Sequence, residues 1–280
     1  MTLKAYRTHF YKELEAFYPQ EEYETFFKVL AQEHLKLAAY EIPLNFQLEL
    51  DEAQTNLFDK ALLRLKQNEP LQYIVASTEF YGFPFQISPA VLIPRPETEE
   101  LVDWIYSDFK NTSCTILDIG TGSGAIAVSL AKLIPEAEVT AIDVSEDALK
   151  IAEANATLNA VNVQFIKQDI LDCYALDRSY DVIVSNPPYV RDLEKKEIKA
   201  NVLNYEPHMA LFVEDQNALI FYKKIAELAI QALQPNGILY FEINQYLSVE
   251  TVGLLKNIGF SQVELRDDFA GKPRMIKAQH

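Results

Sequence analysis

Beyond residue 112, apolar β-rich runs alternate regularly with helix-like stretches, and this pattern constrains the fold more than any other. Five such runs occur: TILDIG, EVTAID, NVQFIKQD, YDVIVSN and GILYFEI. Strands that alternate with helices predict an α/β fold, in which helices cover both faces of a parallel sheet. The tail, SQVELRDDFAGKPRMIKA, looks like two further strands joined by a turn at Gly271.

The first 75 residues follow a different pattern. They contain no glycine, and apolar residues recur three and four positions apart, as in EEYETFFKVLAQEHLKLAAY, which predicts a small all-α domain. The alternating, aromatic-rich run FYGFPFQI then suggests a short hairpin or an extended linker. A new helix is expected to open at Pro96. The predicted organisation is a helical domain over 1–75, a β-hairpin linker over 76–93 and a main domain over 94–280.

Composition and charge exclude several classes of protein. With 49% apolar residues and no run near the roughly 18 apolar residues of a membrane span, the chain is expected to be globular and cytoplasmic, without a membrane segment. Its opening residues lack the apolar core of a secretory signal. Two distant cysteines and four scattered histidines predict no metal site. Binding to nucleic acid relies on basic residues that neutralise phosphates, and the net charge of −16 disfavours this, so no direct nucleic-acid binding is expected.

Three of the chain's eight glycines, at positions 120, 122 and 124, fall where the run TILDIG meets the next helix. Such a turn lets the backbone approach a ligand closely. The GxGxG spacing differs from the GxGxxG of dinucleotide-binding proteins and is the form seen in methyltransferases, whose loop wraps the amino-acid end of S-adenosylmethionine. Asp143, which ends the next run, is placed to bond both ribose hydroxyls, and Asp169 is placed beside the adenine. The alternative is a tight structural turn with two helix caps.

The fourth run leads into Asn186-Pro187-Pro188-Tyr189, at the strand end where such folds bind ligands. The prolines stiffen this loop and remove backbone donors. A carboxamide nitrogen is a poor nucleophile because its lone pair is delocalised into the carbonyl. The Asn186 side-chain oxygen and the Pro187 carbonyl could accept its two N–H groups and orient it, while the Tyr189 ring packs against the amide. A planar NH₂ nitrogen is therefore the predicted substrate atom, whether of an amide or of an exocyclic base amine.

The sequence resembles the PrmC/HemK-type release factor glutamine methyltransferases. The shared segments cover about residues 70–280 and include PLQYIVASTEFYGFPFQI, VLIPRPETEELVDW, LDIGTGSGAIAVSLA, YDVIVSNPPYV, YEPHMALFVEDQNALIFYKKI and DDFAGKPRMIKA. The resemblance implies a class I, Rossmann-like methyltransferase with a mostly parallel seven-stranded sheet. It also implies S-adenosylmethionine as cofactor of the methyltransferase domain over 94–280. The helical domain over 1–75 is expected to dock the substrate, with a purely supporting role as the alternative. The implied reaction is methylation of N5 of the glutamine in the Gly-Gly-Gln motif of class 1 peptide chain release factors.

The resemblance carries site residues over by matched position. The expected cofactor-binding residues are Gly120, Thr121, Gly122, Ser123, Gly124, Asp143, Asp169, Ile170 and Asn186. The expected substrate-binding residues are Asn186, Pro187, Pro188, Tyr189, Phe80 and Arg95, and Asn186, Pro187 and Tyr189 are the expected catalytic residues. Glu97 and Thr98 would lie over the active site, and Arg95 would equally suit an ordinary ion pair.

The chain departs from the family at three places. It has Val75-Ala76-Ser77 where a glycine is usual, Asn244 where glycine is frequent, and Ile170 where some relatives have an aromatic beside the adenine. The chief rival within enzymes is a nucleic-acid exocyclic-amine methyltransferase, which predicts a basic groove. A non-catalytic cofactor-binding subunit predicts a damaged glycine turn or Asn186, and both are intact. A nicotinamide dehydrogenase conflicts with the glycine spacing.

Overall fold

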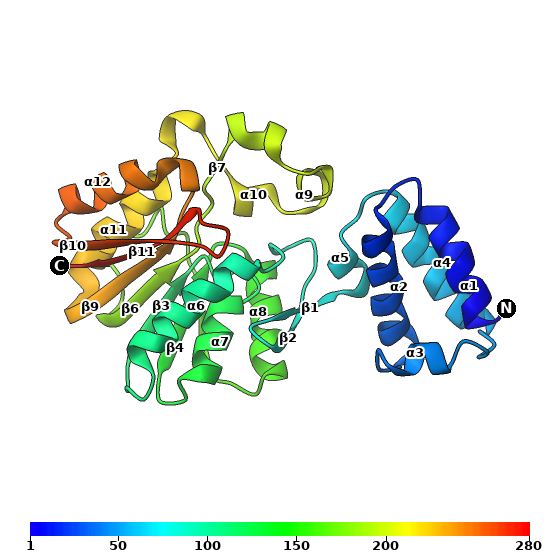
Figure 1. Cartoon of the computed structure of the whole chain (residues 1–280). Coiled ribbons are helices and arrows are strands. Elements are labelled where there is room, and N and C mark those ends of the chain that lie inside the picture. Colours follow the sequence, from blue (N-terminus) through cyan, green and yellow to red (C-terminus); the bar gives the residue numbers. More distant parts are fainter. The chain divides into compact units, whose positions relative to one another are not determined.

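A computed structural model describes residues 1–280 as two compact units, Met1–Ala76 with Lys199–Tyr205, and Ser77–Ile198 with Glu206–His280 (Figure 1). No helix in the chain combines the length and apolar character that crossing a membrane requires. Each unit has a hydrophobic core of its own.

The first unit is all helical, as predicted for the N-terminal residues. Its helices are α1 (Leu3–Leu14), α2 (Gln20–Leu35), α3 (Glu41–Leu44), α4 (Glu52–Lys66), α5 (Leu71–Val75) and α9 (Ala200–Tyr205). On α1, the buried residues Leu3, Tyr6, Phe10 and Leu14 recur every three or four positions and face one core. Asp51 and Gln54 form a capping box that starts α4.

The second unit contains a seven-stranded sheet with its helices. In chain order these elements are α6 (Pro96–Phe109), β3 (Thr115–Ile119), α7 (Ala125–Leu133), β4 (Glu138–Asp143), α8 (Glu146–Leu158), β5 (Gln164–Lys167), β6 (Tyr180–Ser185), α11 (Ile220–Ala232), β9 (Leu233–Glu242), α12 (Ser248–Ile258), β10 (Gln262–Asp267) and β11 (Pro273–Gln279). Shorter elements are β7 (Val190–Arg191), α10 (His208–Leu211) and β8 (Phe212–Val213).

The strand order is β10-β11-β9-β6-β3-β4-β5. Strands β5, β4, β3, β6 and β9 are parallel, and β11 is antiparallel to both of its neighbours, β9 and β10. This confirms the predicted, mostly parallel sheet. Along β6, Val182 and Val184 join the core beneath α6 and α7, whereas Ile183 joins the core beneath α11 and α12. A strand buried on both faces is apolar at every position, which explains the continuous apolar runs in the sequence.

The structure differs from the predicted domain organisation in two places. The predicted linker contains a hairpin, β1 (Ser77–Phe80) and β2 (Phe83–Gln86), which belongs to the second unit because Asn155 of α8 bonds both the N–H and the C=O of Gln86. Residues 199–205 belong to the first unit, where the Tyr205 hydroxyl donates to Gln67 O at 2.9 Å. The division of function between the two units stays a prediction.

Candidate active site

One pocket lies at the carboxyl ends of the parallel strands in the second unit. Its lining comes from the turns after β3, β4, β5 and β6, from the segment before and at the start of α6, and from residues between Pro207 and Ile225. In sheets wound on both faces, ligands bind at this edge. Of the predicted site residues, this pocket brings together Arg95, Gly120, Thr121, Gly122, Ser123, Asp143, Asp169, Ile170, Asn186, Pro187 and Pro188.

The first two glycines of the turn keep its backbone accessible. Gly120 and Gly122 have φ values of 75° and 56°, and a Cβ added to either would meet no atom within 4 Å. Positive φ is the region that glycine enters without strain, and the open space belongs to the pocket. Thr121 holds the turn from beneath, because its buried hydroxyl donates to Asp118 Oδ2 at 2.6 Å.

Gly124 has a different role, because it does not line the pocket. It precedes α7 with a φ of 80°, and a Cβ there would lie 3.0 Å from the Ala152 Cβ of α8 and 3.2 Å from the Ala152 Cα. The absence of a side chain at Gly124 therefore lets α7 and α8 approach each other. Gly124 therefore has a packing function, and its predicted contact with the cofactor stays a prediction.

Substituting Gly124 with alanine should destabilise the protein. The left-handed backbone costs an L-residue about 1–2 kcal/mol, and the close approach of Ala152 adds to this. We expect a lower midpoint of thermal unfolding. Gly253 provides the matched control, because it lies within α12 with open space around it. Gly253→Ala should be neutral or stabilising by about 0.5–1 kcal/mol. Equal midpoints for the two variants would contradict this role of Gly124.

Asp143 joins the end of β4 to the glycine turn. Its Oδ2 accepts from the Gly122 N–H and its Oδ1 from the Ser145 N–H, each at 2.8 Å. Burial raises the pKa of this carboxyl, and these backbone N–H groups oppose the rise. Each carboxylate oxygen retains a second lone pair, so Asp143 can still accept from a ligand in the pocket.

The turn after β5 supplies the next part of the lining. Asp169 is exposed and accepts from the Leu171 N–H at 2.9 Å, while Ile170 is buried beside it. Both residues line the pocket, together with Gln168. The apolar side chain of Ile170 next to the carboxylate of Asp169 suits a flat ring that has polar atoms at its edge.

The loop after β6 brings Asn186, Pro187 and Pro188 into the pocket. Ser185 anchors it by donating from its hydroxyl to Ile119 O at 2.7 Å. Asn186 Nδ2 donates to Thr98 Oγ1 at 3.3 Å. No group of the chain donates to Asn186 Oδ1 or to the Pro187 carbonyl, so two acceptors lie side by side in sequence at the pocket.

Two predicted substrate residues do not line the pocket. Phe80 is buried in the core of the second unit, where its ring meets Phe85 edge-on at 5.9 Å between centroids. Both rings pack into the hydrophobic core of the second unit, and a contact of Phe80 with the substrate stays a prediction. Tyr189 points its hydroxyl at Glu242, donating to Oε1 at 2.9 Å, and packs with the core beneath α11.

Arg95 lines the pocket as a member of an ion pair. Its guanidinium lies 2.5 Å from Oε1 of Glu206, whose side chain is 1% exposed. The Glu206 Oε2 accepts from the Ile93 N–H at 3.3 Å. The pair therefore connects the segment before α6 to the segment before α10. Arg95 was predicted either to bind substrate or to form an ordinary ion pair, and the structure contains the ion pair.

Three buried acids beside the site were not predicted from the sequence: Asp118, Glu206 and Glu242. Asp118 lies inside β3 and Glu242 ends β9, and each directly follows a run of apolar residues. Burial raises the pKa of Asp118 to about 7, and the Thr121 hydroxyl opposes the rise. A charged residue inside an apolar run is costly unless it has partners, and this was the signal that could have found both strand acids.

The glycine turn after β3, the acid that ends β4 and the seven-stranded sheet together define a class I methyltransferase. Residues 6–75 match the PrmC N-terminal domain family, and residues 98–209 match the Methyltransferase small domain family. The chain belongs to the release factor glutamine methyltransferase family. It is 51% identical to the release factor glutamine methyltransferase of Flavobacterium psychrophilum over 99% of both chains, and 42% identical to that of Bacteroides thetaiotaomicron over 95% of both.

Solved structures of low sequence identity share the fold. A methyltransferase from Pyrococcus furiosus is 21% identical with a TM-score of 0.54, over 77% of this chain and 98% of that one. The hMettl16 catalytic domain, solved in complex with MAT2A 3'UTR hairpin 6, is 16% identical with a TM-score of 0.56, over 82% of both chains. At these identities the likeness concerns the fold alone.

Proposed function

We propose that this chain methylates N5 of the glutamine in the Gly-Gly-Gln motif of class 1 peptide chain release factors, with S-adenosylmethionine as the methyl donor. Membership of the release factor glutamine methyltransferase family supports the reaction and the cofactor. One structural observation carries the chemistry. Asn186 Oδ1 and the Pro187 carbonyl are two acceptors without donors from the chain, at a pocket shared with the glycine turn.

The residues of the pocket fit S-adenosylmethionine. Gly120 and Gly122 leave open space above a turn followed by the start of α7, which suits the amino-acid end of the cofactor. Asp143 would accept from the ribose hydroxyls, and Asp169 with Ile170 would lie against the adenine. When bound, S-adenosylmethionine supplies a methyl group activated by a sulfonium.

The loop after β6 is suited to an amide nucleophile. An amide nitrogen attacks weakly because its lone pair is shared with the carbonyl. Accepting its two N–H groups at Asn186 Oδ1 and Pro187 O would fix the plane of the amide and favour the positive charge that develops on nitrogen. The two prolines stiffen the loop, so these acceptors would need little rearrangement when the substrate binds. No strong base is required, since the alkylated nitrogen loses its proton readily.

The charge of the pocket favours an amide over a nucleotide amine. Arg95 is the one basic residue in the lining, and Glu206 already neutralises it. Asp143 and Asp169 add negative charge to the same lining. A site that holds a nucleic-acid strand would instead need unpaired cations for its phosphates.

The decisive experiment is incubation of the purified protein with labelled S-adenosylmethionine and a purified class 1 release factor, followed by peptide mapping by mass spectrometry. One labelled methyl group is expected on the glutamine of the Gly-Gly-Gln motif. A release factor with alanine at that glutamine is the control and should stay unlabelled. Label on added ribosomal or transfer RNA, with none on the release factor, would instead establish the nucleic-acid methyltransferase.

A further inference from the structure

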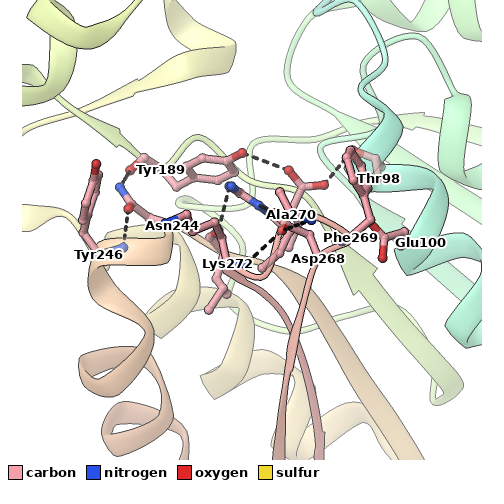
Figure 2. A network of polar contacts seen from close by, with 12 residues as sticks. Thr98, Glu100, Tyr189, Asn244, Tyr246, Asp268, Phe269, Ala270 and Lys272 are labelled. Atoms are coloured by element: carbon pink, nitrogen blue, oxygen red, sulfur yellow. Dashed lines mark hydrogen bonds and ion pairs between the residues drawn. The ribbon is translucent and has the colours of Figure 1, made fainter.

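A chain of side-chain hydrogen bonds leads from the pocket into the protein. Asn186 Nδ2 donates to Thr98 Oγ1 at 3.3 Å, and the Thr98 hydroxyl donates to Glu242 Oε2 at 2.6 Å. The Tyr189 hydroxyl donates to the other oxygen, Glu242 Oε1, at 2.9 Å. Figure 2 shows Thr98 and Tyr189 within this network of polar contacts. Thr98 and Glu242 are 4% and 1% exposed, so water does not compete for these bonds.

The order of donors along this chain is set by chemistry. An ionised carboxylate only accepts hydrogen bonds, and a threonine hydroxyl has a single hydrogen to give. Because Thr98 gives its hydrogen to Glu242, its oxygen can only accept from Asn186. The side-chain amide of Asn186 must therefore turn its NH₂ toward Thr98, which leaves Oδ1 as the atom without a partner in the chain.

The two hydroxyl groups that face Glu242 fit the accepting form, against the effect of burial on its carboxyl. Burial raises its pKa, and the hydrogen bonds from Thr98 and Tyr189 oppose the rise, as does the positive charge of Arg274. Glu97 adds a smaller upward influence. Both carboxylate oxygens have a hydroxyl donor, which is the arrangement that an ionised carboxylate requires.

We propose that Thr98 and Glu242 are positioning residues that set the direction of the Asn186 amide, so that its oxygen meets the NH₂ group of the substrate. The proposal rests on the proposed function, because it assigns the acceptor that an amide substrate needs. With the Asn186 amide turned around, one NH₂ group would face another, and no hydrogen bond would form between them.

Three separate parts of the fold hold this arrangement. Thr98 lies in the first turn of α6, which begins at Pro96, and Glu242 ends β9 beside β6. Asn244, which follows β9, donates from Nδ2 to the Tyr189 carbonyl at 2.9 Å. The loop after β6 is thus fastened on both sides of its prolines, at Asn186 and at Tyr189.

Thr98 offers a nearly isosteric test. Thr98→Val removes the hydroxyl and keeps the shape, so Asn186 loses the acceptor that selects its direction. We expect kcat for release factor methylation to fall about tenfold, the effect of losing about 1.4 kcal/mol of oriented hydrogen bonding. The dissociation constant for S-adenosylmethionine, measured by calorimetry, should change less than about twofold. Thr98→Ser restores the hydroxyl and should recover most of the lost kcat. Equal kcat for the valine variant and the wild type would overturn the proposal.

A double-mutant cycle tests whether Thr98 and Glu242 act together. Glu242→Gln keeps the shape but replaces one acceptor with a donor, so it should also lower kcat. If the two residues act through Asn186 as one chain, the variant with both Thr98→Val and Glu242→Gln should be no slower than the slower single variant. Independent structural damage would give losses that multiply, and that outcome would contradict the proposal. Thermal midpoints of all three variants show whether each remains folded.

A measurement without substrate separates this proposal from the proposed function. The side-chain amide resonance of Asn186, assigned by its loss in Asn186→Ala, should shift in Thr98→Val and return toward the wild-type position in Thr98→Ser. An unshifted resonance in Thr98→Val would overturn the positioning role even if release factor methylation is confirmed. A failure of the wild-type protein to methylate a release factor would overturn the proposed function and leave this resonance test unaffected.

Discussion

Replacing Asn186 with alanine is expected to lower the turnover of release factor methylation by about 10²–10³-fold, the usual effect of removing one oriented catalytic hydrogen-bonding group. Asn186 Oδ1 is the side-chain acceptor at the pocket, and no other side chain of the loop after β6 replaces it, since Tyr189 faces Glu242. Single-turnover kinetics with saturating labelled S-adenosylmethionine measures this loss directly.

Affinity for the cofactor separates this effect from general damage. Asn186 is one of many residues in the lining, and the glycine turn and Asp143 stay intact in the variant. The dissociation constant of S-adenosylmethionine should therefore remain within about threefold of the wild type, about 0.7 kcal/mol. Asn257, exposed on α12, provides the matched control, and Asn257→Ala should leave both quantities unchanged. Wild-type turnover in Asn186→Ala would show that the nitrogen is held by other groups.

The sheet could be predicted from the sequence because its pattern is local. Strands buried on both faces are apolar throughout, and each helix between them has its own periodicity, so the alternation specifies the architecture before any contact is known. The turn at Gly271 between β10 and β11, and the start of α6 at Pro96, lie where they were predicted. The order of the strands in the sheet does not follow from this local pattern, because it depends on pairing between distant segments.

The parts of the site that the sequence left hidden depend on such distant pairing. Thr98 and Glu242 are 144 positions apart, and they meet only because β9 pairs with β6 at the edge where α6 begins. Nothing near Glu242 in the sequence indicates a partner for its carboxylate. Its place at the end of an apolar strand was the one local sign that a partner must exist.

The packing of Phe80 and Gly124 also depends on distant segments of the chain. Alternation along the hairpin shows that Phe80 and Phe85 share the inward face, but the sequence does not show what that face covers. A glycine next to a cofactor turn suggests contact with the ligand, whereas Gly124 makes room for Ala152 of another helix. In both cases the residue type indicated a packing constraint, but the residue that it packs against is determined by the tertiary fold.

The second large effect is expected at Asp143, where alanine should weaken S-adenosylmethionine binding by about 10²-fold. Charged hydrogen bonds contribute about 1.5–3 kcal/mol each, so losing those to the ribose would account for this change. Asp143 also holds the glycine turn through the Gly122 N–H, and this anchor would be lost in the same variant.

Isothermal titration of Asp143→Ala with S-adenosylmethionine measures the loss of affinity, and Asp147→Ala is its matched control. Asp147 lies in the first turn of α8, outside the pocket, and its exposed carboxylate bonds Lys150. Removing it changes the net charge by the same amount and should leave affinity intact. Turnover of Asp143→Ala should recover toward the wild type at saturating cofactor, because Asn186 and Pro187 are untouched. If affinity were unchanged while turnover fell, Asp143 would act on the methyl-transfer step, and the ribose would have to bind elsewhere in the pocket.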